Sequence, residues 1–279
     1  MAFGFFETSR SRGAPIQLFR FRYGVFADEA FCYTDGEREY THMGLTYKPV
    51  PIKRTSFVTS GEKGSGQPLQ VSLPGNTEIC QLFRVSAPPG QITLTVFQGH
   101  ARDPDSEFLA IWIGRVSSCG WAENDATLVC ESAKTQLRRL ALRRHYQYMC
   151  PHVLYGDQCR ASEAAASTPV VVNTIEGRFV TLNGLLPNKD RYVGGMLKFI
   201  DAKQIVHARA ILAVAEVGGR TRVSLSGVMG DLVVGMAVNA VRGCTHDLNG
   251  CSTHANTLNF GGQPYIPITN PLGVNGAFS

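Results

Sequence analysis

The sequence predicts a mainly β protein, a β-rich α+β fold with two β-sandwich or barrel-like domains. Three observations predict it: short runs in which apolar and polar residues alternate, glycine- and proline-rich turns between these runs, and a length of 279 residues. One ordinary domain has about 100–200 residues, so this length favours two. We place an N-terminal β-rich domain at residues 1–148 and a C-terminal β domain at residues 149–279.

The first domain is predicted from period-two alternation between residues 16 and 130. Apolar residues alternate with polar ones over residues 19–23, 69–73 and 92–96. This spacing puts every second side chain on one face of a strand. The intervening sequences GEKGSGQP, LPGN and PPG supply turn geometry. The pattern is typical of a sandwich or a barrel.

One segment, residues 133–146, has helical rather than strand periodicity. Ser132 is a candidate cap, and Leu137, Leu140 and Ala141 fall at helical spacing. The sequence therefore predicts a short basic helix that closes the first domain. It could contact phosphates of DNA, but a solvated face or a subunit contact is favoured, because interleaved aromatic residues and a known DNA-binding pattern are missing. The basic residues are Lys134, Arg138, Arg139, Arg143 and Arg144.

The second domain is predicted from β-branched, glycine-punctuated runs over residues 165–243, which follow the small-residue stretch RASEAAASTP. From Gly243 onward, proline, asparagine and glycine are frequent. We expect this C-terminal segment to be irregular and to need a fastener or a partner that orders it.

Composition excludes several classes of protein. Hydrophobic residues make up 44% and charged residues 18%, which is typical of folded rather than disordered chains. No apolar run reaches the roughly 18 residues that a membrane-spanning helix needs. The N-terminus lacks the pattern of an export signal, so we expect a reducing, cytosol-like site of synthesis. A net charge of +5 is too small to indicate a nucleic-acid-binding protein.

Two close cysteine pairs are the candidate metal ligands: Cys150 and Cys159 in MCPHVLYGDQC, and Cys244 and Cys251 in GCTHDLNGC. Each pair lies among turn-forming residues, where the backbone can direct two sulfurs to one point. The C-x8-C and C-x6-C spacings leave metal ligation and four unliganded thiols equally open. If a metal is present, the spacing does not distinguish zinc from a [4Fe-4S] cluster. Nearby histidines that could support the site, or simply lie at the surface, are His152, His246 and His254.

Other chemistry-bearing residues favour structural roles. Cys32, Cys80, Cys119 and Cys130 lie in or beside apolar runs and are expected to be ordinary buried thiols. The carboxylates of HARDPDSEF, at positions 103, 105 and 107, are expected in a solvated connection between strands. The motifs of nucleophilic hydrolases, P-loop proteins, zinc proteases and dinucleotide-binding proteins do not occur. The sequence therefore predicts a protein that is not an enzyme.

Several longer stretches carry a resemblance that covers nearly the whole chain. They are FCYTDGEREYTHMGLTYKPVPIKR, LQVSLPGN, TLTVFQGH, IWIGRV, LRRHYQYMCPHVLYGDQC and RGCTHDLNGCSTHANTLNFGGQPYIP. Together they resemble the tail hub proteins of long-tailed bacteriophages, the family of the minor tail protein L of phage lambda and of the hub protein of gene transfer agents. The most specific parts are LYG-x2-C and GC-x6-C-x4-N-x2-NFGG-x-P.

The resemblance implies a cofactor and a place in the virion. It implies that Cys150, Cys159, Cys244 and Cys251 hold a [4Fe-4S] cluster, since all four matching positions are cysteine. It implies a ring-forming homotrimer, made in the host cytoplasm, at the tail tip. The implied partners are the distal tail protein, the tape measure protein and the central fibre or receptor-binding protein. The final residues, ITNPLGVNGAFS, fall outside the resemblance.

We expect such a cluster to be structural and to fix the relation between the two domains, because it would close a loop of about a hundred residues. The alternatives are a zinc-stabilised assembly protein with the same four ligands and an iron-sulfur enzyme. The enzyme would need an open coordination site, for which the sequence offers no residue.

Overall fold

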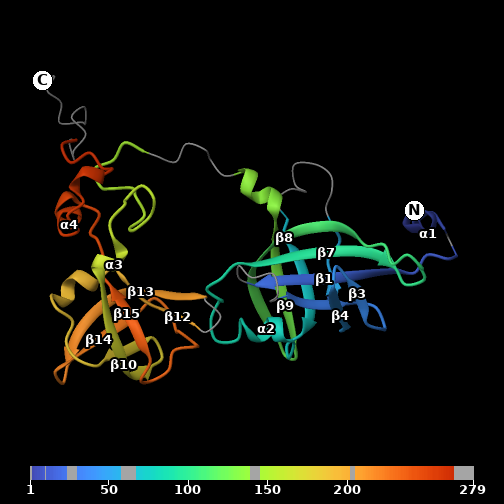
Figure 1. Ribbon diagram of the computed structural model, residues 1–279, viewed down its shortest axis with the longest axis horizontal. Coiled ribbons are helices and arrows are strands. Elements are labelled where there is room, and N and C mark those ends of the chain that lie inside the picture. The colour runs from blue at the N-terminus through green and yellow to red at the C-terminus, as the bar shows by residue number, and fades with distance from the viewer. Residues whose placement is uncertain are drawn as a thin grey trace, which may run out of the picture. The chain divides into compact units, whose positions relative to one another are not determined.

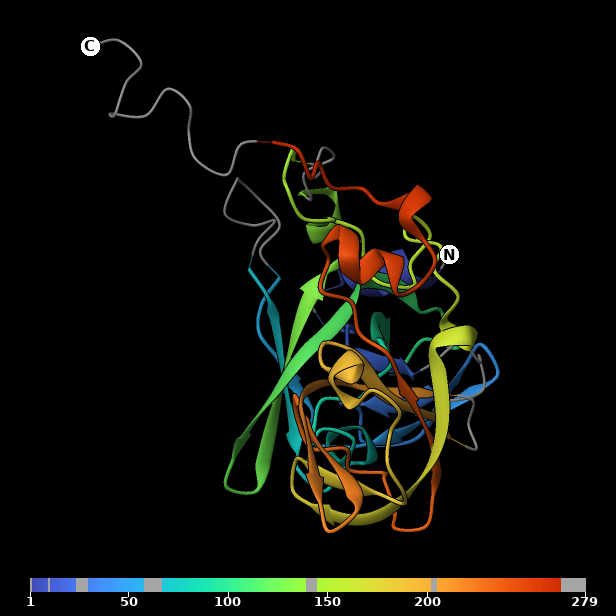
Figure 2. The same cartoon turned by 90° about the vertical axis from the view of Figure 1, so that its left-hand side faces the viewer.

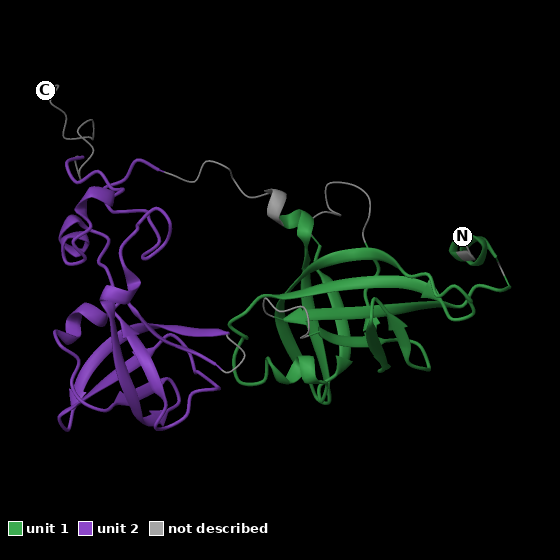
Figure 3. Cartoon of the chain, viewed as in Figure 1, with its two compact units in different colours: residues 1–140 green, residues 141–279 purple. Residues whose placement is uncertain are grey.

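The chain forms two compact units, residues 1–140 and 141–279 (Figure 3). The computed structural model describes residues 2–9, 11–23, 30–57, 67–138, 145–201 and 205–266. Both units are built mainly from strands, with a few short helices (Figure 1). The predicted mainly β fold class is thus confirmed.

The first unit contains a nine-stranded sheet in the order β3-β4-β2-β1-β7-β8-β9-β6-β5 (Figure 1). Its strands are β1 (Pro15–Tyr23), β2 (Ala30–Thr34), β3 (Tyr40–His42), β4 (Leu45–Pro49), β5 (Lys53–Arg54), β6 (Leu69–Pro74), β7 (Ile92–His100), β8 (Leu109–Ala122) and β9 (Asp125–Ser132). All pairs are antiparallel except the parallel pair β2 and β4.

Alternation along β6 buries one face of that strand, as the sequence predicts, whereas β1 and β7 bury side chains on both faces, such as the neighbours Leu18 and Phe19 in β1. In β7, Ile92, Leu94 and Val96 are buried, and in β6 Leu69, Val71 and Leu73 are buried. β1 pairs with β7 along its full length, from Pro15 opposite His100 to Tyr23 opposite Ile92. Apolar side chains of these strands exclude water from one another, so the β1–β7 pair forms the centre of the core.

Three short helical segments flank the sheet: α1 (Ala2–Thr8), α2 (Glu78–Gln81) and the 3-10 helix η1 (Ala133–Arg138). The helix predicted over residues 133–146 is confirmed at residues 133–138, as a 3-10 helix rather than an α-helix. Residues 145 and 146 are not helical. Residues 139–144, with Arg139, Arg143 and Arg144, lie outside the described part of the chain.

The second unit is built on a closed six-stranded barrel in the order β10-β11-β14-β13-β12-β15. The strands are β10 (Ser167–Glu176), β11 (Phe179–Leu182), β12 (Met196–Ile200), β13 (Val206–Val217), β14 (Arg220–Leu225) and β15 (Ala237–Val241). Fully buried Leu182, Leu197, Ile211 and Leu225 point into its interior, so side chains fill the barrel.

Two irregular segments, one before and one after the barrel, lie side by side beyond one end of it (Figures 1 and 2). The first runs from residue 145 to α3 (Glu163–Ala166). The second follows β15 and contains α4 (Leu248–Ser252) and the 3-10 helix η3 (Thr257–Asn259). The barrel also carries the 3-10 helix η2 (Lys189–Tyr192). The expectation of an irregular C-terminal segment is met up to residue 266, and the residues from Pro267 lie outside the described part.

Within the described residues, no helix has the length and apolar character needed to span a membrane.

Candidate metal centre

The second cysteine pair is positioned by a capped turn just after β15. Asp247 precedes α4, and its Oδ1 accepts hydrogen bonds from Thr245 Oγ1 at 2.6 Å and from Gly250 N at 2.5 Å. Both bonds lower the pKa of Asp247, and the bond from Thr245 has the larger effect. The cap begins α4, which places Cys251 in its last turn with its side chain buried. Cys244 and Cys251 are thereby held on the same turn.

The position of Cys244 also depends on a close backbone crossing between two glycines. Gly243 N donates to Arg191 O at 2.8 Å, and a Cβ built on Gly195 would lie 2.7 Å from Gly243 N and closer still to Val241 O. A Cβ on Gly243 would likewise meet the backbone of Gly194, at 2.7 Å from its carbonyl carbon. Any side chain at residue 195 or 243 would therefore push the two chain segments apart.

Cys150 is joined to the second pair through His246. Cys150 N donates to His246 O at 2.7 Å, and His246 Nδ1 lies 3.1 Å from Cys150 O. The two residues are 96 positions apart in the sequence, so local turn geometry cannot bring them together. The first irregular segment is thus fastened to the turn that carries Cys244.

Cys159 is joined to the C-terminal segment through Asn256. The Asn256 Nδ2 atom donates to Cys159 O and lies 3.6 Å from Cys159 Sγ. Asn256 is buried, its Oδ1 accepts from Asn259 Nδ2 at 2.7 Å, and its backbone O accepts from Cys251 Sγ at 3.0 Å. One buried residue therefore links both cysteine pairs, through its side-chain amide to Cys159 and through its backbone carbonyl to Cys251.

Three of the four sulfurs accept hydrogen bonds from N–H groups. His246 N lies 3.4 Å from Cys244 Sγ, Gly261 N lies 3.4 Å from Cys150 Sγ, and Asn256 Nδ2 reaches Cys159 Sγ. N–H donors directed at sulfur stabilise a thiolate, the form that binds a metal, and hydrogen bonds to cluster sulfurs are among the protein's means of tuning an iron-sulfur centre. The donor set therefore fits a thiolate-bound centre.

The four thiols also share one electrostatic neighbourhood. Burial raises the pKa of Cys244, and charge on Cys159 and Cys150 raises it further. The pKa of Cys251 is raised by burial first and then by Cys244, Cys150 and Cys159. Four thiolates brought together in this way repel one another, so a bound cation or cationic cluster would offset the repulsion.

The described residues do not contain three or more His, Cys, Asp or Glu side chains already arranged to hold a metal ion. Metal ligation by Cys150, Cys159, Cys244 and Cys251 thus remains a prediction. A polynuclear cluster holds four thiolates farther apart than a single zinc does, because each thiolate binds a different iron.

The three nearby histidines contact the backbone of this region rather than lying free at the surface. His254 Nε2 lies 2.9 Å from Gly243 O, His152 Nδ1 lies 3.2 Å from Asn259 O, and His246 contacts Cys150. His152 is buried, and its ring lies where a Cβ on Gly261 would be. The histidines therefore stabilise the two irregular segments that carry the cysteines, through contacts with backbone oxygens.

All four candidate ligands lie in the second unit, residues 141–279. The expectation that a centre here would fix the relation between two domains was therefore wrong. A centre would close a loop within the second unit, because the segment that carries Cys150 and Cys159 packs beside the C-terminal segment instead of ending the first unit.

The roles of Asn256 and Gly261 were not assigned from the sequence, although both lie in the stretch NTLNFGG that carries the resemblance. The sequence shows an asparagine five residues after Cys251 and then two adjacent glycines. This pattern indicates a turn, but it does not show which residues the turn contacts.

We expect Asn256→Ala to lower the free energy of unfolding by about 1–3 kcal/mol, because Cys159 O and Asn259 Nδ2 both lose their hydrogen-bond partner. Urea unfolding of the metal-free protein measures this. The matched control is Asn249→Ala, whose side chain is exposed in α4 and whose loss should be nearly neutral. Equal stability of the two variants would contradict the linking role of Asn256.

The other cysteines behave as structural thiols. Cys32, Cys80 and Cys130 are buried, and Cys119 is partly exposed. Burial raises the pKa of each of the four, to about 11 for Cys119 and to about 12 for Cys130. The expectation of buried thiols is confirmed for Cys32, Cys80 and Cys130 and was wrong for Cys119.

The carboxylates at 103, 105 and 107 lie in the connection between β7 and β8. The prediction of a solvated connection holds except at Asp103, which is buried. Its Oδ1 accepts from Asp105 N at 3.0 Å and its Oδ2 from Glu107 N at 3.2 Å. Asp103 thus closes the turn.

Comparisons with known proteins give one family match and one whole-chain structural match. A family model described as "Phage conserved hypothetical protein BR0599" matches residues 190–270, which include Cys244 and Cys251. This is well under half of the chain. None of the curated proteins matches.

A chain from a structure titled "Virion of native gene transfer agent (GTA) particle" is similar to this one with a TM-score of 0.75 and 18% sequence identity. The match covers 100% of this chain and 99% of that chain. The two chains therefore share a fold over their whole length.

Proposed function

We propose that this chain is a structural protein of a phage or phage-like virion, the hub at the tip of a long tail, and not an enzyme. As a hub it would form a homotrimeric ring at the distal end of the tail tube. There it would contact the distal tail protein, the tape measure protein and the central fibre or receptor-binding protein.

Two independent similarities support a virion role. The structural match covers both units of this chain, and the matched chain belongs to a gene transfer agent particle. The family model that matches residues 190–270 describes a conserved phage protein. The sequence stretches around both cysteine pairs, which resemble tail hub proteins, support the finer assignment to the tail tip.

We further propose that Cys150, Cys159, Cys244 and Cys251 hold a structural [4Fe-4S] cluster. The observation that carries this proposal is the set of N–H groups directed at the sulfurs of Cys150, Cys159 and Cys244. The cluster would supply iron-thiolate bonds that fasten the segment before the barrel to the segment after it. The chain's own residues, above all Asn256 and His246, hold the two segments in register.

Zinc is the rival occupant, because four thiolates also satisfy its tetrahedral preference. Protein isolated without oxygen should contain about four irons and about four acid-labile sulfides per chain. If the protein instead contains about one zinc per chain and no sulfide, the four cysteines bind zinc and not a cluster. A chain with neither metal after anaerobic isolation would contradict both.

The place in the virion is tested separately from the metal. Antibodies against this chain, labelled with gold, should bind purified particles at the free end of the tail. Light scattering of the isolated protein should give the mass of three chains. Labelling along the tube or on the head would contradict the hub assignment without affecting the metal result.

A further inference from the structure

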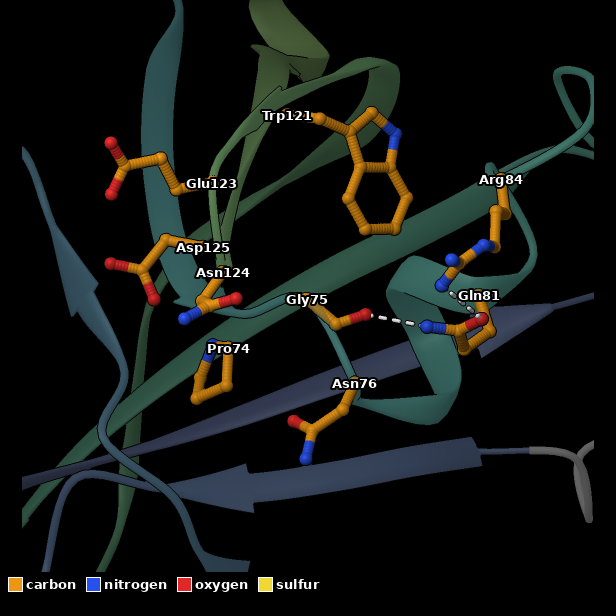
Figure 4. Close-up of a pocket in the computed structure, with 9 residues that line it drawn as sticks. All are labelled: Pro74, Gly75, Asn76, Gln81, Arg84, Trp121, Glu123, Asn124 and Asp125. Atoms are coloured by element: carbon orange, nitrogen blue, oxygen red, sulfur yellow. Dashed lines mark hydrogen bonds between the residues drawn. The ribbon is translucent and has the colours of Figure 1, made fainter.

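A pocket of about 620 Å³ lies in the first unit, at the turn that joins β8 to β9 (Figure 4). Its walls come from that turn, from the end of β6 and from the segment around α2. Its volume is within the range of about 300–1,000 Å³ that small-molecule sites have. Neither the sequence patterns nor the proposed hub function accounts for it.

One wall of the pocket is the indole ring of Trp121. The side chain is 42% exposed, although tryptophan is one of the more costly residues to leave in water. The ring rests on backbone at Gly75, where a Cβ would lie 3.0 Å from Trp121 Cζ3. Gly75 N donates to Asn124 O at 2.7 Å, which fixes the two turns against each other. The turn at Gly75 thus supports one side of the indole and leaves apolar ring surface open.

The remaining walls carry polar groups of both kinds. The Gln81 amide donates to Gly75 O at 2.6 Å and accepts from Arg84 Nη1 at 3.4 Å, so Arg84 is held at the pocket with further donors unused. Asn76, Glu123 and Asp125 also line the pocket, although in Figure 4 the carboxylates of Glu123 and Asp125 point away from the Trp121 ring. Within the described part of the chain, these three side chains have no intramolecular hydrogen bond. They are therefore available to a ligand.

The turn that carries Glu123 has a constrained backbone. Glu123 has φ +51° at the hairpin between β8 and β9, a left-handed conformation that glycine or asparagine usually occupies. Backbone outliers of this kind often occur at ligand-binding sites. Here the conformation fixes the hairpin turn that forms one wall of the pocket.

These features select one class of ligand. An anion would meet the two carboxylates of Glu123 and Asp125 against the single guanidinium of Arg84. A wholly apolar ligand would strip water from the polar groups without replacing their hydrogen bonds. A sugar ring has an apolar C–H face that packs on an indole and hydroxyls that both donate and accept. We propose that this pocket binds a neutral saccharide, with Trp121 as the stacking platform and Arg84 and Asn76 as partners of its hydroxyls. The proposal does not depend on the metal centre.

The test uses Trp121 as its own reporter. The chain has two tryptophans, so Trp112→Phe in the full-length protein leaves Trp121 as the single source of indole fluorescence. Methyl glycosides of glucose, galactose, mannose and N-acetylglucosamine, and their short oligosaccharides, are titrated to millimolar concentration. We expect a saturable change in emission with at least one sugar series, and tighter binding of the longer members.

Two variants test the assignment of residues. Asn76→Ala, which keeps the reporter, should weaken binding about tenfold, the effect of about 1.4 kcal/mol. Trp121→Ala, followed by saturation-transfer NMR of the sugar, should abolish binding, while Tyr265→Ala, an exposed aromatic residue of the second unit, should leave it unchanged.

No saturable signal with any of the four series would overturn the proposal. So would sugar binding that is undiminished in both Asn76→Ala and Trp121→Ala. Capture of another tail protein that Trp121→Ala abolishes, without a sugar signal, would assign this surface to a protein contact and would also overturn it.

Discussion

Protein carrying Cys244→Ser is expected to lose iron and sulfide and to loosen the C-terminal segment after β15. A serine hydroxyl is a far weaker ligand than a thiolate, so one corner of the proposed cluster would be left unbound. Residues 150–251 form a loop of about a hundred residues, and a crosslink that closes such a loop stabilises a fold by about 4–5 kcal/mol in the chain-entropy model. Iron and sulfide analysis after anaerobic isolation, with limited proteolysis of the C-terminal segment, measures both effects.

The matched control is Cys119→Ser, which removes a thiol of the first unit that is only partly exposed and is no candidate ligand. It should keep full iron and sulfide content and leave the C-terminal segment as resistant to protease as in the unaltered protein. If Cys244→Ser kept its metal and its protease resistance, or if it gave infectious particles at the normal yield, the ligand assignment would fall.

Gly243→Ala is expected to destabilise the second unit by at least about 3 kcal/mol. The new Cβ would meet the carbonyl oxygen of Val193 and would lie 2.7 Å from the carbonyl carbon of Gly194, both of which are backbone atoms that cannot rotate away. The crossing of residues 195 and 243 would have to open, and Cys244 would move with it. Urea unfolding of the second unit measures the loss, and the metal content should fall as well.

Gly227→Ala is the control for this substitution, because its Cβ would lie 3.7 Å from Arg209 Nε and would meet no backbone atom within 4 Å. Its free energy of unfolding should change by less than about 1 kcal/mol. If alanine at positions 243 and 227 changed the free energy of unfolding equally, the two backbone segments at the crossing could move apart at little cost. The crossing would then not fix the position of Cys244.

The two results separate ligand chemistry from architecture. Cys244→Ser removes a thiolate and leaves the crossing intact, whereas Gly243→Ala keeps every thiolate and disturbs the crossing. We expect both variants to lose the metal. Only Gly243→Ala should also lower the stability of the metal-free protein, because the glycine crossing positions Cys244 whether or not a metal is bound.

Much of the fold could be predicted from local sequence. In β6 the alternation of Leu69, Val71 and Leu73 with polar residues puts one face into the core, because the side-chain period of a strand is two. The helix predicted over residues 133–146 is confirmed at residues 133–138, but as a 3-10 helix, because periodicity over so few residues does not distinguish the two helix types.

The candidate site was predictable in its residue types but not in its construction. Two cysteine pairs in turn-forming sequences indicate metal chemistry wherever they lie, since thiolates are strong ligands. The resemblance supplied the grouping of the four. Neither revealed that Asn256 donates to Cys159, because the sequence does not state the distance between residues 97 positions apart.

The sequence by itself determined the mainly β class, the strands with alternating burial and the thiols that could bind a metal, because these depend on residue chemistry and on neighbours within a few positions. Only the tertiary structure decided that N–H groups of residues 246, 256 and 261 face three of the four cysteine sulfurs, and that glycines 195 and 243 cross beside Cys244. Each of these depends on closing the six-stranded barrel, which brings the chain before β10 and the chain after β15 to the same end.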